Sequence, residues 1–591
     1  MTSEAPESEG SSKLPLLENC LETEDDDSSR HLTFGAIVRI ATMHACTTIA
    51  KGLAVLFPRQ VVFSSSERRY RSYIMILLKE HGLHELNTRI VLVCLFQAVI
   101  GATVFCIPSF LHRYVEPASA RKDTQHHATA FLDGLRGWAS LIVYAAHTCG
   151  CECESCKPIQ CARLIHSKGF SYLDSPWKSD AGLIDNWYRL PFIRLSYSGP
   201  AAVCIFFVVS GYSLSIKALR QMQRNDTHGS FLTIRSATFR RPVRLYLPIV
   251  VSTFLWVLSA NLGIFESARP YYDDTDLFRN NRERLTPMPD AFLSSQIGGF
   301  YHWIKDIMYL CVTSIEYWTD GKFRLGETYD IHLWTIPIEF YKSLVLFSVL
   351  VVITGVRPAA RFATVVLLLS IAVIYDWWAM ILYWSGLLLV MIDTTITAKR
   401  RVVSLPISPT TQPSQTSWQA SVNLKSCIFL AITIASYYLL SVPDACLDET
   451  FGFGFAAVCK LTPFQNPPGM FWQSVGAIGL VLSASHLAPL RRIYSSPVLT
   501  YFGWISYALY ILHGLVGHTI GMPIFWHVYN LIGRETYLQW YTSWIIGFTL
   551  MTAILIWAAD VFTRAVDIPS VQLAKSLEGW CFEAESERSK A

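Results

Sequence analysis

The 591-residue sequence is poor in charged residues. Asp, Glu, Lys and Arg make up only 16% of it, against about a quarter in soluble globular proteins. Apolar residues make up 52%, and the mean hydropathy is +0.32. The net charge of +4 is small and gives no support for a nucleic-acid partner. The composition therefore points to a membrane environment.

The apolar residues lack the alternating pattern of a membrane β-barrel, whose strands read as segments of about ten residues. They form continuous stretches with no or few charges, close to the ~20 residues that a helix needs to cross the hydrocarbon core. These stretches are residues 90–111, 131–150, 199–216, 245–265, 333–355, 362–392, 426–443, 470–490, 497–533 and 541–559. Asp376 predicts a tight turn between two helices. We predict an all-α polytopic membrane protein with a bundle of about eleven transmembrane helices.

The N-terminus lacks the apolar core of a cleavable signal peptide. Residues 1–34 are polar and acidic, which predicts a disordered tail. Residues 35–130 are expected to be an extension with one clear transmembrane helix at 90–111. The main transmembrane domain should then cover residues 131–563, and residues 564–591 should form a cytosolic C-terminal tail.

The cysteines lack the paired spacing of a zinc site. The one dense group has no second pair or histidine to complete a metal site, and its members are Cys149, Cys151, Cys153, Cys156 and Cys161. Partial disulfide pairing in a lumenal loop is favoured over metal binding. We predict no metal site.

Lys and Arg collect in alternate connections between the apolar stretches, within residues 217–244, 357–361, 399–425 and 491–492. The positive-inside rule places these connections in the cytosol. The cysteine group and the long segment 266–332 then lie on the opposite side. We expect a multi-pass protein of the endoplasmic reticulum, another endomembrane or the plasma membrane, with membrane lipid as a partner.

Ionisable residues inside apolar segments are costly, so each is a functional candidate. Arg136 and His147 lie eleven positions apart. At ~100° per residue they return to within about 20° of one helix face, roughly 16 Å apart along the axis. An anionic donor held near Arg136 could therefore extend an arm toward a base at His147. Structural packing of the two side chains is the alternative interpretation.

Five short motifs occur in order along the chain. They are FLDGLRGWASLIVYAAH (131–147), FFVVSGY (206–212), FRRPVRLYLP (239–248), LWTIPIEF (333–340) and GWISYALYILH (503–513). This set resembles the acyltransferase-3 family, in which an Arg is followed by ten residues and a His. The extra N-terminal segment and tail are similar to those of filamentous-fungal members, whereas the long 265–332 loop is a departure. The resemblance implies that residues 131–563 are an acyltransferase-3 domain and that the protein is a membrane O-acyltransferase.

The resemblance implies transfer of an acyl group from acyl-CoA to a hydroxyl group, with acetyl the favoured acyl group. Acyl-CoA is then a co-substrate, and no cofactor is bound. His147 is expected to be the general base, because transfer to an alcohol requires removal of its proton. Glu339 should orient or charge His147, although an ion pair with Lys342 is the alternative. His513 is expected to contact the substrate.

Four arginines are expected to bind the CoA phosphates, because guanidinium groups bind phosphate oxygens in bidentate pairs. They are Arg136, Arg240, Arg241 and Arg244. Anchoring to anionic lipid is the alternative for the last three. The other expected substrate-binding residues are Ser210, Tyr212, Trp334 and Tyr510.

Three acceptor classes are open: a small secondary metabolite, a lipid-like compound and a carbohydrate. A proton-coupled secondary transporter is the rival function, because intramembrane Arg, His and Glu would suit one. No inverted repeat of the kind that transporters contain is evident in the sequence. An intramembrane hydrolase would instead need Ser210 as an activated nucleophile.

Overall fold

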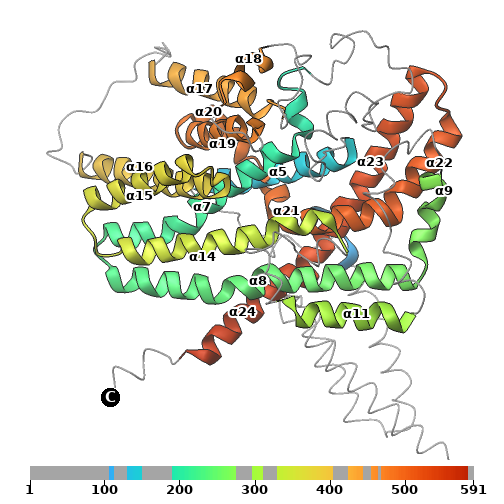
Figure 1. The fold of residues 1–591 in the computed structure, drawn as a ribbon, viewed down its shortest axis with the longest axis horizontal. Helices are drawn as coiled ribbons and strands as arrows, with labels where there is room; N and C mark the ends of the chain where they lie inside the picture. Colours follow the sequence, from blue (N-terminus) through green and yellow to red (C-terminus); the bar gives the residue numbers. More distant parts are fainter. Residues whose placement is uncertain are drawn as a thin grey trace, which may run out of the picture. The chain divides into compact units, whose positions relative to one another are not determined.

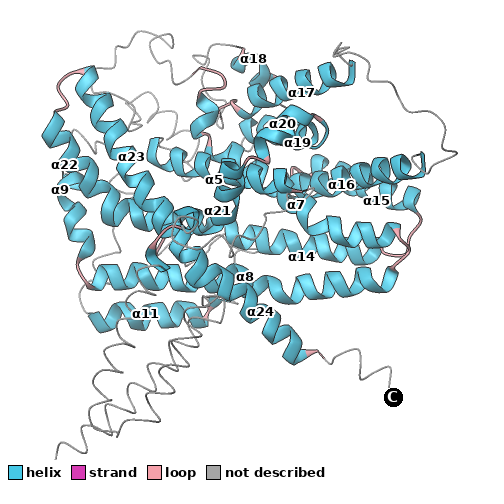
Figure 2. Cartoon of the chain, turned by 180° about the vertical axis from the view of Figure 1, so that it is seen from behind, coloured by secondary structure: helices cyan, strands magenta, loops and turns pink. Residues whose placement is uncertain are grey.

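The computed structural model describes residues 105–111, 129–149, 190–273, 296–310, 329–403, 424–443, 454–462 and 468–582. All of them lie in one unit, Val91–Ala591. Every element in these ranges is a helix, which confirms the all-α prediction (Figures 1 and 2). The predicted N-terminal tail, most of the 90–111 segment and Cys151 to Cys161 lie outside the described residues.

The first half of the described chain runs from η1 to α14. Its helices are η1 (Ser109–Leu111), α5 (Ala130–Cys149), η5 (Arg194–Tyr197), α7 (Gly199–Gln223), α8 (Thr227–Asn261), η6 (Ile264–Ala268), α9 (Arg269–Asp273), α11 (Gln296–Met308), η7 (Ile331–Trp334) and α14 (Thr335–Ile353). The second half continues with α15 (Pro358–Ile374), α16 (Trp378–Val403), α17 (Leu424–Leu440), α18 (Phe455–Lys460), α19 (Pro468–His486), α20 (Ala488–Tyr494), α21 (Pro497–Val516), η8 (Gly517–Gly521), α22 (Met522–Ile532), α23 (Tyr537–Phe562), η9 (Thr563–Asp567) and α24 (Ile568–Cys581).

Within the described residues, six helical stretches are long and apolar enough to cross a membrane: Gly199–Gln223, Thr227–Asn261, His332–Ile353, Trp378–Ile396, Pro497–Ile532 and Leu538–Cys581. A seventh is added if α19 and α20, bent by 103°, are counted as one span. The multi-pass prediction is therefore supported, but the predicted number of about eleven is not confirmed. Helices α15 and α17 have 17 residues each, which is short for a span.

Two local predictions can be followed in the structure. Asp376 has a φ of +52° in the turn between α15 and α16, as the tight-turn prediction requires. Residues beyond 563, expected to be a cytosolic tail, begin in the π turn η9 and continue as α24, which packs on α8. Arg240 of α8 pairs with Glu578 of α24 at 3.2 Å. The C-terminal region is thus helical up to Cys581.

Helices α5 and α21 cross in close contact near the site. A Cβ atom at Gly137 would lie 2.3 Å from the carbonyl oxygen of Leu499, and one at Gly503 would lie 2.1 Å from that of Asp133. A Cβ at Gly134 would be closer still to the end of α20. Small residues let membrane helices approach in this way. The DGLRG motif therefore supplies the contact surface of α5.

A second close crossing joins α7 and α16. A Cβ atom at Gly211 would lie 2.2 Å from the carbonyl oxygen of Tyr383, and one at Gly386 would lie 2.3 Å from that of Val208. The SGY sequence of α7 thus serves backbone packing, as its glycine predicts. The crossing fixes α7 as one wall of the site described below.

Three of the connections expected on the cytosolic side lie at one end of the bundle. The α7–α8 and α14–α15 turns lie at the left in Figure 1, beside the end of α16. A Cβ atom at Gly355 would lie 4.0 Å from Cγ2 of Thr227, the first residue of α8, so the two turns are close together. This arrangement agrees with the alternation of basic connections, while the side of the membrane itself stays a prediction.

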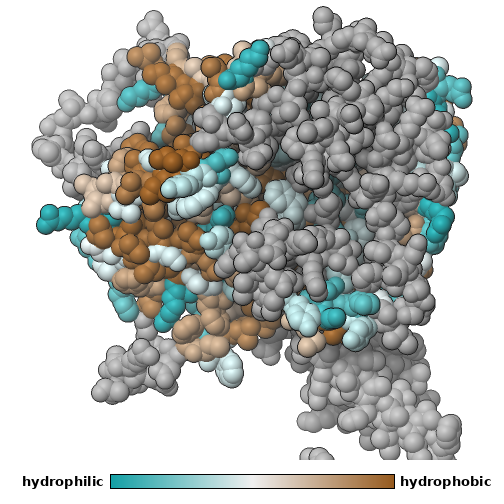
Figure 3. Space-filling view, in the orientation of Figure 1, coloured by the Kyte–Doolittle hydropathy of each residue, from teal (hydrophilic) through white to brown (hydrophobic). Residues whose placement is uncertain are grey.

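Apolar side chains spread over the outer side of the bundle around α15 and α16 (Figure 3). Exposed members on α14 and α15 include Val352 (70%), Leu367 (61%) and Ile374 (72%). An apolar surface of this kind is unfavourable in water and favourable against lipid tails. The outer side of these helices is therefore suited to face the bilayer.

We expect Gly137→Ala to lower the melting temperature of the detergent-purified protein. Alanine is favoured over glycine inside a helix, but here its Cβ would overlap the backbone of α21. Overpacking of this kind costs about 1–3 kcal/mol. Gly579→Ala is the matched control, since nothing lies within 4 Å of a Cβ there. Equal thermal stability of the two variants would contradict the close crossing.

Candidate active site

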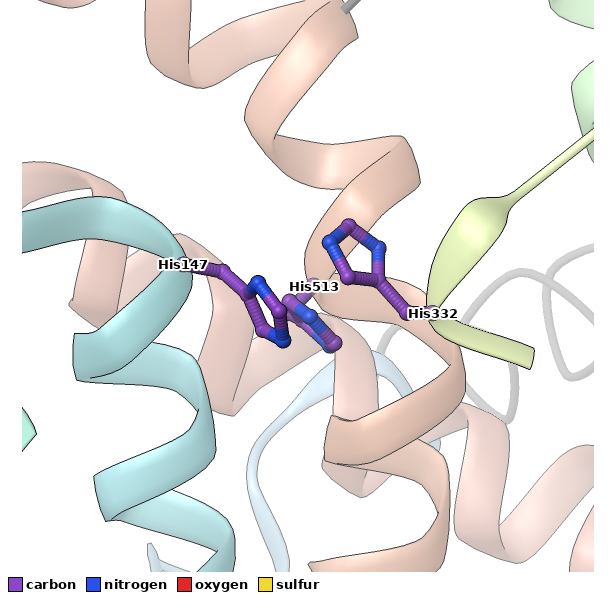
Figure 4. A group of neighbouring side chains, drawn as sticks. All are labelled: His147, His332 and His513. Atoms are coloured by element: carbon purple, nitrogen blue, oxygen red, sulfur yellow. The ribbon is translucent and has the colours of Figure 1, made fainter. Parts of the chain in front are cut away.

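Three histidines from distant parts of the chain face one another (Figure 4). His147 comes from the last turn of α5, His332 from η7 and His513 from the last turn of α21. Ring centroids are 4.1 Å apart for His147 and His332, 4.4 Å for His332 and His513, and 5.2 Å for His147 and His513. The structure therefore brings His147 and His513 together, with His332 close to both.

His332 is held by a buried carboxylate. Asp330 caps η7 by accepting the backbone N–H of His332 at 3.0 Å, and the same oxygen lies 2.5 Å from Nδ1 of the ring. Asp330 is only 3% exposed. Burial acts to raise the pKa of Asp330, but the charge and hydrogen bonds of His332 outweigh burial and hold that pKa below its ordinary value. The ring therefore donates from Nδ1 to Asp330, and Nε2 lies on the opposite side of the ring.

His513 also has its hydrogen on Nδ1, but a backbone carbonyl and not a carboxylate accepts it. Its Nδ1 lies 2.6 Å from the carbonyl oxygen of Tyr510, which can only accept, so Nδ1 carries the hydrogen. Its Nε2 is buried and has no hydrogen-bond partner within the described part of the chain. In both rings Nδ1 is placed as the donor, so the neutral form of each ring has its lone pair on Nε2, as a proton acceptor requires.

One ring nitrogen from each histidine lies within 4.8 Å of the others. Three imidazoles are a known zinc donor set. Nitrogen ligands at about 2.0–2.1 Å from a tetrahedral ion are roughly 3.4 Å apart, so binding would require the rings to draw together. That no metal binds remains a prediction.

A cavity of about 290 Å³ lies among α5, α7, α8, α14 and α21. Six of the residues expected from sequence line it: Arg136, Ser210, Arg241, Arg244, Glu339 and Tyr510. Asp567 of η9 lines it as well. Three guanidinium groups against two carboxylates leave a formal charge of +1. The cavity can therefore receive an anionic group.

Glu339 is paired with an arginine. Nη2 of Arg241 donates to Oε1 of Glu339 at 2.7 Å, and Nε of Arg241 donates to Ser343 at 3.2 Å. The carboxylate that accompanies the histidines is that of Asp330. The alternative partner suggested for Glu339, Lys342, points toward the ring of Tyr341 instead. Glu339 thus positions an arginine in the cavity wall.

Tyr510 joins the cavity to the histidines. It lines the cavity, and its hydroxyl donates to the backbone carbonyl of His332. Because that proton is committed, the 2.6 Å contact with Thr335 places the threonine hydroxyl as donor to Tyr510. The histidine cluster therefore lies directly behind the Tyr510 wall of the cavity.

Four expected substrate-binding residues are not among those that line the cavity. One is His513, which belongs to the histidine cluster. Arg240 pairs with Glu578 of α24, and the hydroxyl of Tyr212 donates to Asp393 of α16 at 2.7 Å. Trp334 packs, half-buried, against the apolar core. Neighbours in a helical motif point in different directions at ~100° per residue, so a motif does not supply all its residues to one site.

Two residues of the site were absent from the sequence-based prediction: Asp330 and His332. Both precede the LWTIPIEF motif, outside any apolar stretch. The signal that could have found them was their spacing. An Asp two positions before a His can cap a helical turn and at the same time hold the imidazole ring of that His.

We expect Arg241→Met to lower the melting temperature by more than the double variant Arg241→Met/Glu339→Gln. Removing one partner leaves a largely buried carboxylate unpaired, which costs up to about 3–5 kcal/mol. The double change removes the charge that would be left. Thermal unfolding of both variants in detergent checks this. If the single variant is as stable as the double one, the ion pair does not contribute as its geometry indicates.

Comparison with known proteins identifies the family. The acyltransferase domain family, acyltransferase-3, matches residues 129–564. The chain is 27% identical over 485 residues to the O-acetyltransferase PaAT-1 of Phomopsis amygdali, covering 78% of this chain and 86% of that one. It is 24% identical over 463 residues to the acyltransferase clz18 of Cochliobolus lunatus, covering 76% and 95%. No solved structure matches the chain.

The matched region contains the histidine cluster and every residue that lines the cavity except Asp567. Its helices include the candidate membrane spans described above. The chain is an enzyme that belongs to the acyltransferase-3 family of membrane acyltransferases.

Proposed function

We propose that this enzyme transfers an acetyl group from acetyl-CoA to a hydroxyl group of a small-molecule acceptor. Acetyl transfer to oxygen is supported by the likeness to PaAT-1, whose name describes an O-acetyltransferase. The observation that carries the proposal is the single wall, formed by Tyr510 and Thr335, between a basic cavity and a histidine cluster. This layout offers an anion site and a base on the two sides of one reacting carbonyl.

The cavity is the proposed site of the donor. Its volume of about 290 Å³ is at the lower limit of the roughly 300–1,000 Å³ typical of ligand sites, so it suits one end of a large donor. Arg136 and Arg244 line it from α5 and α8. Guanidinium groups in a low-dielectric wall attract phosphate strongly. The acetyl end of the donor would then lie toward Tyr510.

His147 is the proposed base that takes the acceptor's proton. As the hydroxyl O–H bond breaks, the oxygen forms a bond to the acetyl carbon. The carbon–sulfur bond then breaks, and its electron pair leaves on the sulfur of CoA. The proton held by the histidines passes to this sulfur, so that the products are an ester and CoA thiol. General-base catalysis of this kind contributes about 10²–10⁴-fold.

The acceptor is proposed to be a hydroxylated small molecule, with lipid-like and carbohydrate compounds as further classes. A lipophilic acceptor could reach the cluster from the bilayer, and the likeness to fungal acyltransferases suits a role in secondary metabolism. Membership of an enzyme family removes the reason for favouring a proton-coupled transporter.

We expect microsomes with the wild-type enzyme to release CoA from labelled acetyl-CoA in the presence of extracted host lipids and metabolites. The label should enter an extractable ester. His147→Ala should abolish this incorporation, because the proposed base is lost. Absence of CoA release by folded wild-type enzyme across a broad acceptor panel would contradict the proposed function.

We expect Arg244→Ala to raise the KM for acetyl-CoA by about tenfold or more, since a lost charge-assisted hydrogen bond removes about 1.5–3 kcal/mol. Arg240→Ala should change it little, because Arg240 pairs with Glu578 away from the cavity. Arg240 and Arg244 are matched in residue type, in their position on α8 and in the predicted side of the membrane. A larger effect at Arg240 would place the donor outside the cavity.

A further inference from the structure

Asp330 and His332 have the geometry of a base held by its orienting carboxylate. The 2.5 Å contact joins Oδ1 of Asp330 to Nδ1 of His332, and the ring of His332 lies 4.1 Å from that of His147, centroid to centroid. In a Ser-His-Asp triad, a buried carboxylate in this position sets the tautomer and stabilises the protonated ring. His147 has the neighbour that it needs to pass a proton onward.

The backbone around the pair is shaped to hold it. A Cβ atom at Gly514 would lie 2.7 Å from Oδ2 of Asp330 and 2.9 Å from Nδ1 of His332. Only glycine therefore leaves room for the pair against α21. On the other side, the hydroxyl of Tyr510 donates to the carbonyl of His332 and fixes η7 to the cavity wall. Side chain and backbone of His332 are thus held independently.

A positive charge on any of the three histidines needs a carboxylate partner. Three rings lie together with their side chains largely buried, and a proton added to any of them would be costly in an apolar surrounding. Asp330 is the only carboxylate that contacts one of the three rings within the described residues. An imidazolium formed in the cluster is therefore best stabilised on His332.

We propose that His332 is a second catalytic base, which takes over the acceptor's proton from His147, and that Asp330 is its positioning residue. This inference rests on the proposed function. The proton leaves the acceptor oxygen for His147, moves to Nε2 of His332, and finally passes to the departing sulfur of CoA. No proton is gained or lost over the cycle.

The test uses the full-length purified enzyme with labelled acetyl-CoA and the extracted lipid and metabolite fraction at saturation. Asp330→Asn and His332→Gln should lower kcat by about 10²–10⁴-fold, as expected for loss of general-base function or of its tautomer. The KM for acetyl-CoA should stay within about threefold of wild type, because the arginine cavity is untouched. Unchanged kcat in either variant would overturn the inference.

A second pair of variants guards against simple unfolding. Gly514→Ala should push the Asp330–His332 pair out of place and lower kcat. The KM for acetyl-CoA should again stay close to the wild-type value. Gly517→Ala, one turn further along, is the control, because its Cβ would lie 3.3 Å from the flexible methyl group of Met551. Similar loss in both variants, or a collapse of the melting temperature together with a raised KM, would show a structural role and overturn the inference.

Failure of this inference can be separated from failure of the proposed function. If His147→Ala is inactive and Asp330→Asn is fully active, acyl transfer stands and the role of His332 is refuted. Elemental analysis of the purified protein adds an independent readout. About one equivalent of zinc in the wild type, lost in His332→Gln, would identify a metal site and overturn the proton-transfer role.

Discussion

The crossing of α5 on α21 is the constraint on which the rest of the site depends. Gly137 and Gly503 allow the backbones to touch, so the two helices cannot slide without a clash. Arg136 lies within this contact and His147 at the end of the same helix. His513 lies in the last turn of α21, and its ring is 5.2 Å from that of His147, centroid to centroid. The distance between anion site and base is thereby built into one rigid pair of helices.

The remaining elements complete the two parts of the site along this pair of helices, the arginine-lined cavity and the histidine cluster. Helices α7, α8 and α14 close the cavity, and the Arg241–Glu339 pair joins α8 to α14 across it. The short η7 then brings Asp330 and His332 against α21. Tyr510 contacts both halves, so a change on the cavity side reaches His332 through one side chain. Buried polar groups in such a network are costly unless paired, which favours a single arrangement.

Features that depend on helical periodicity or on glycine spacing could be predicted from the sequence. The eleven-residue interval between Arg136 and His147 predicted a shared helix face, and both residues reach the site. Pairing across distant segments could not be predicted, because Arg241 and Glu339, or His332 and His147, meet only after the helices pack. The number of spans was not confirmed, since hydropathy cannot separate a short apolar helix such as α17 from a complete span.

The most direct test of the account is the structure of the enzyme with an unreactive acetyl-CoA analogue, determined by cryo-electron microscopy. The account predicts phosphate density beside Arg136 and Arg244, and the acetyl group at the wall formed by Tyr510 and Thr335, facing the three histidines. An analogue bound elsewhere, or with its acetyl group on the side of the cavity away from Tyr510, would contradict it.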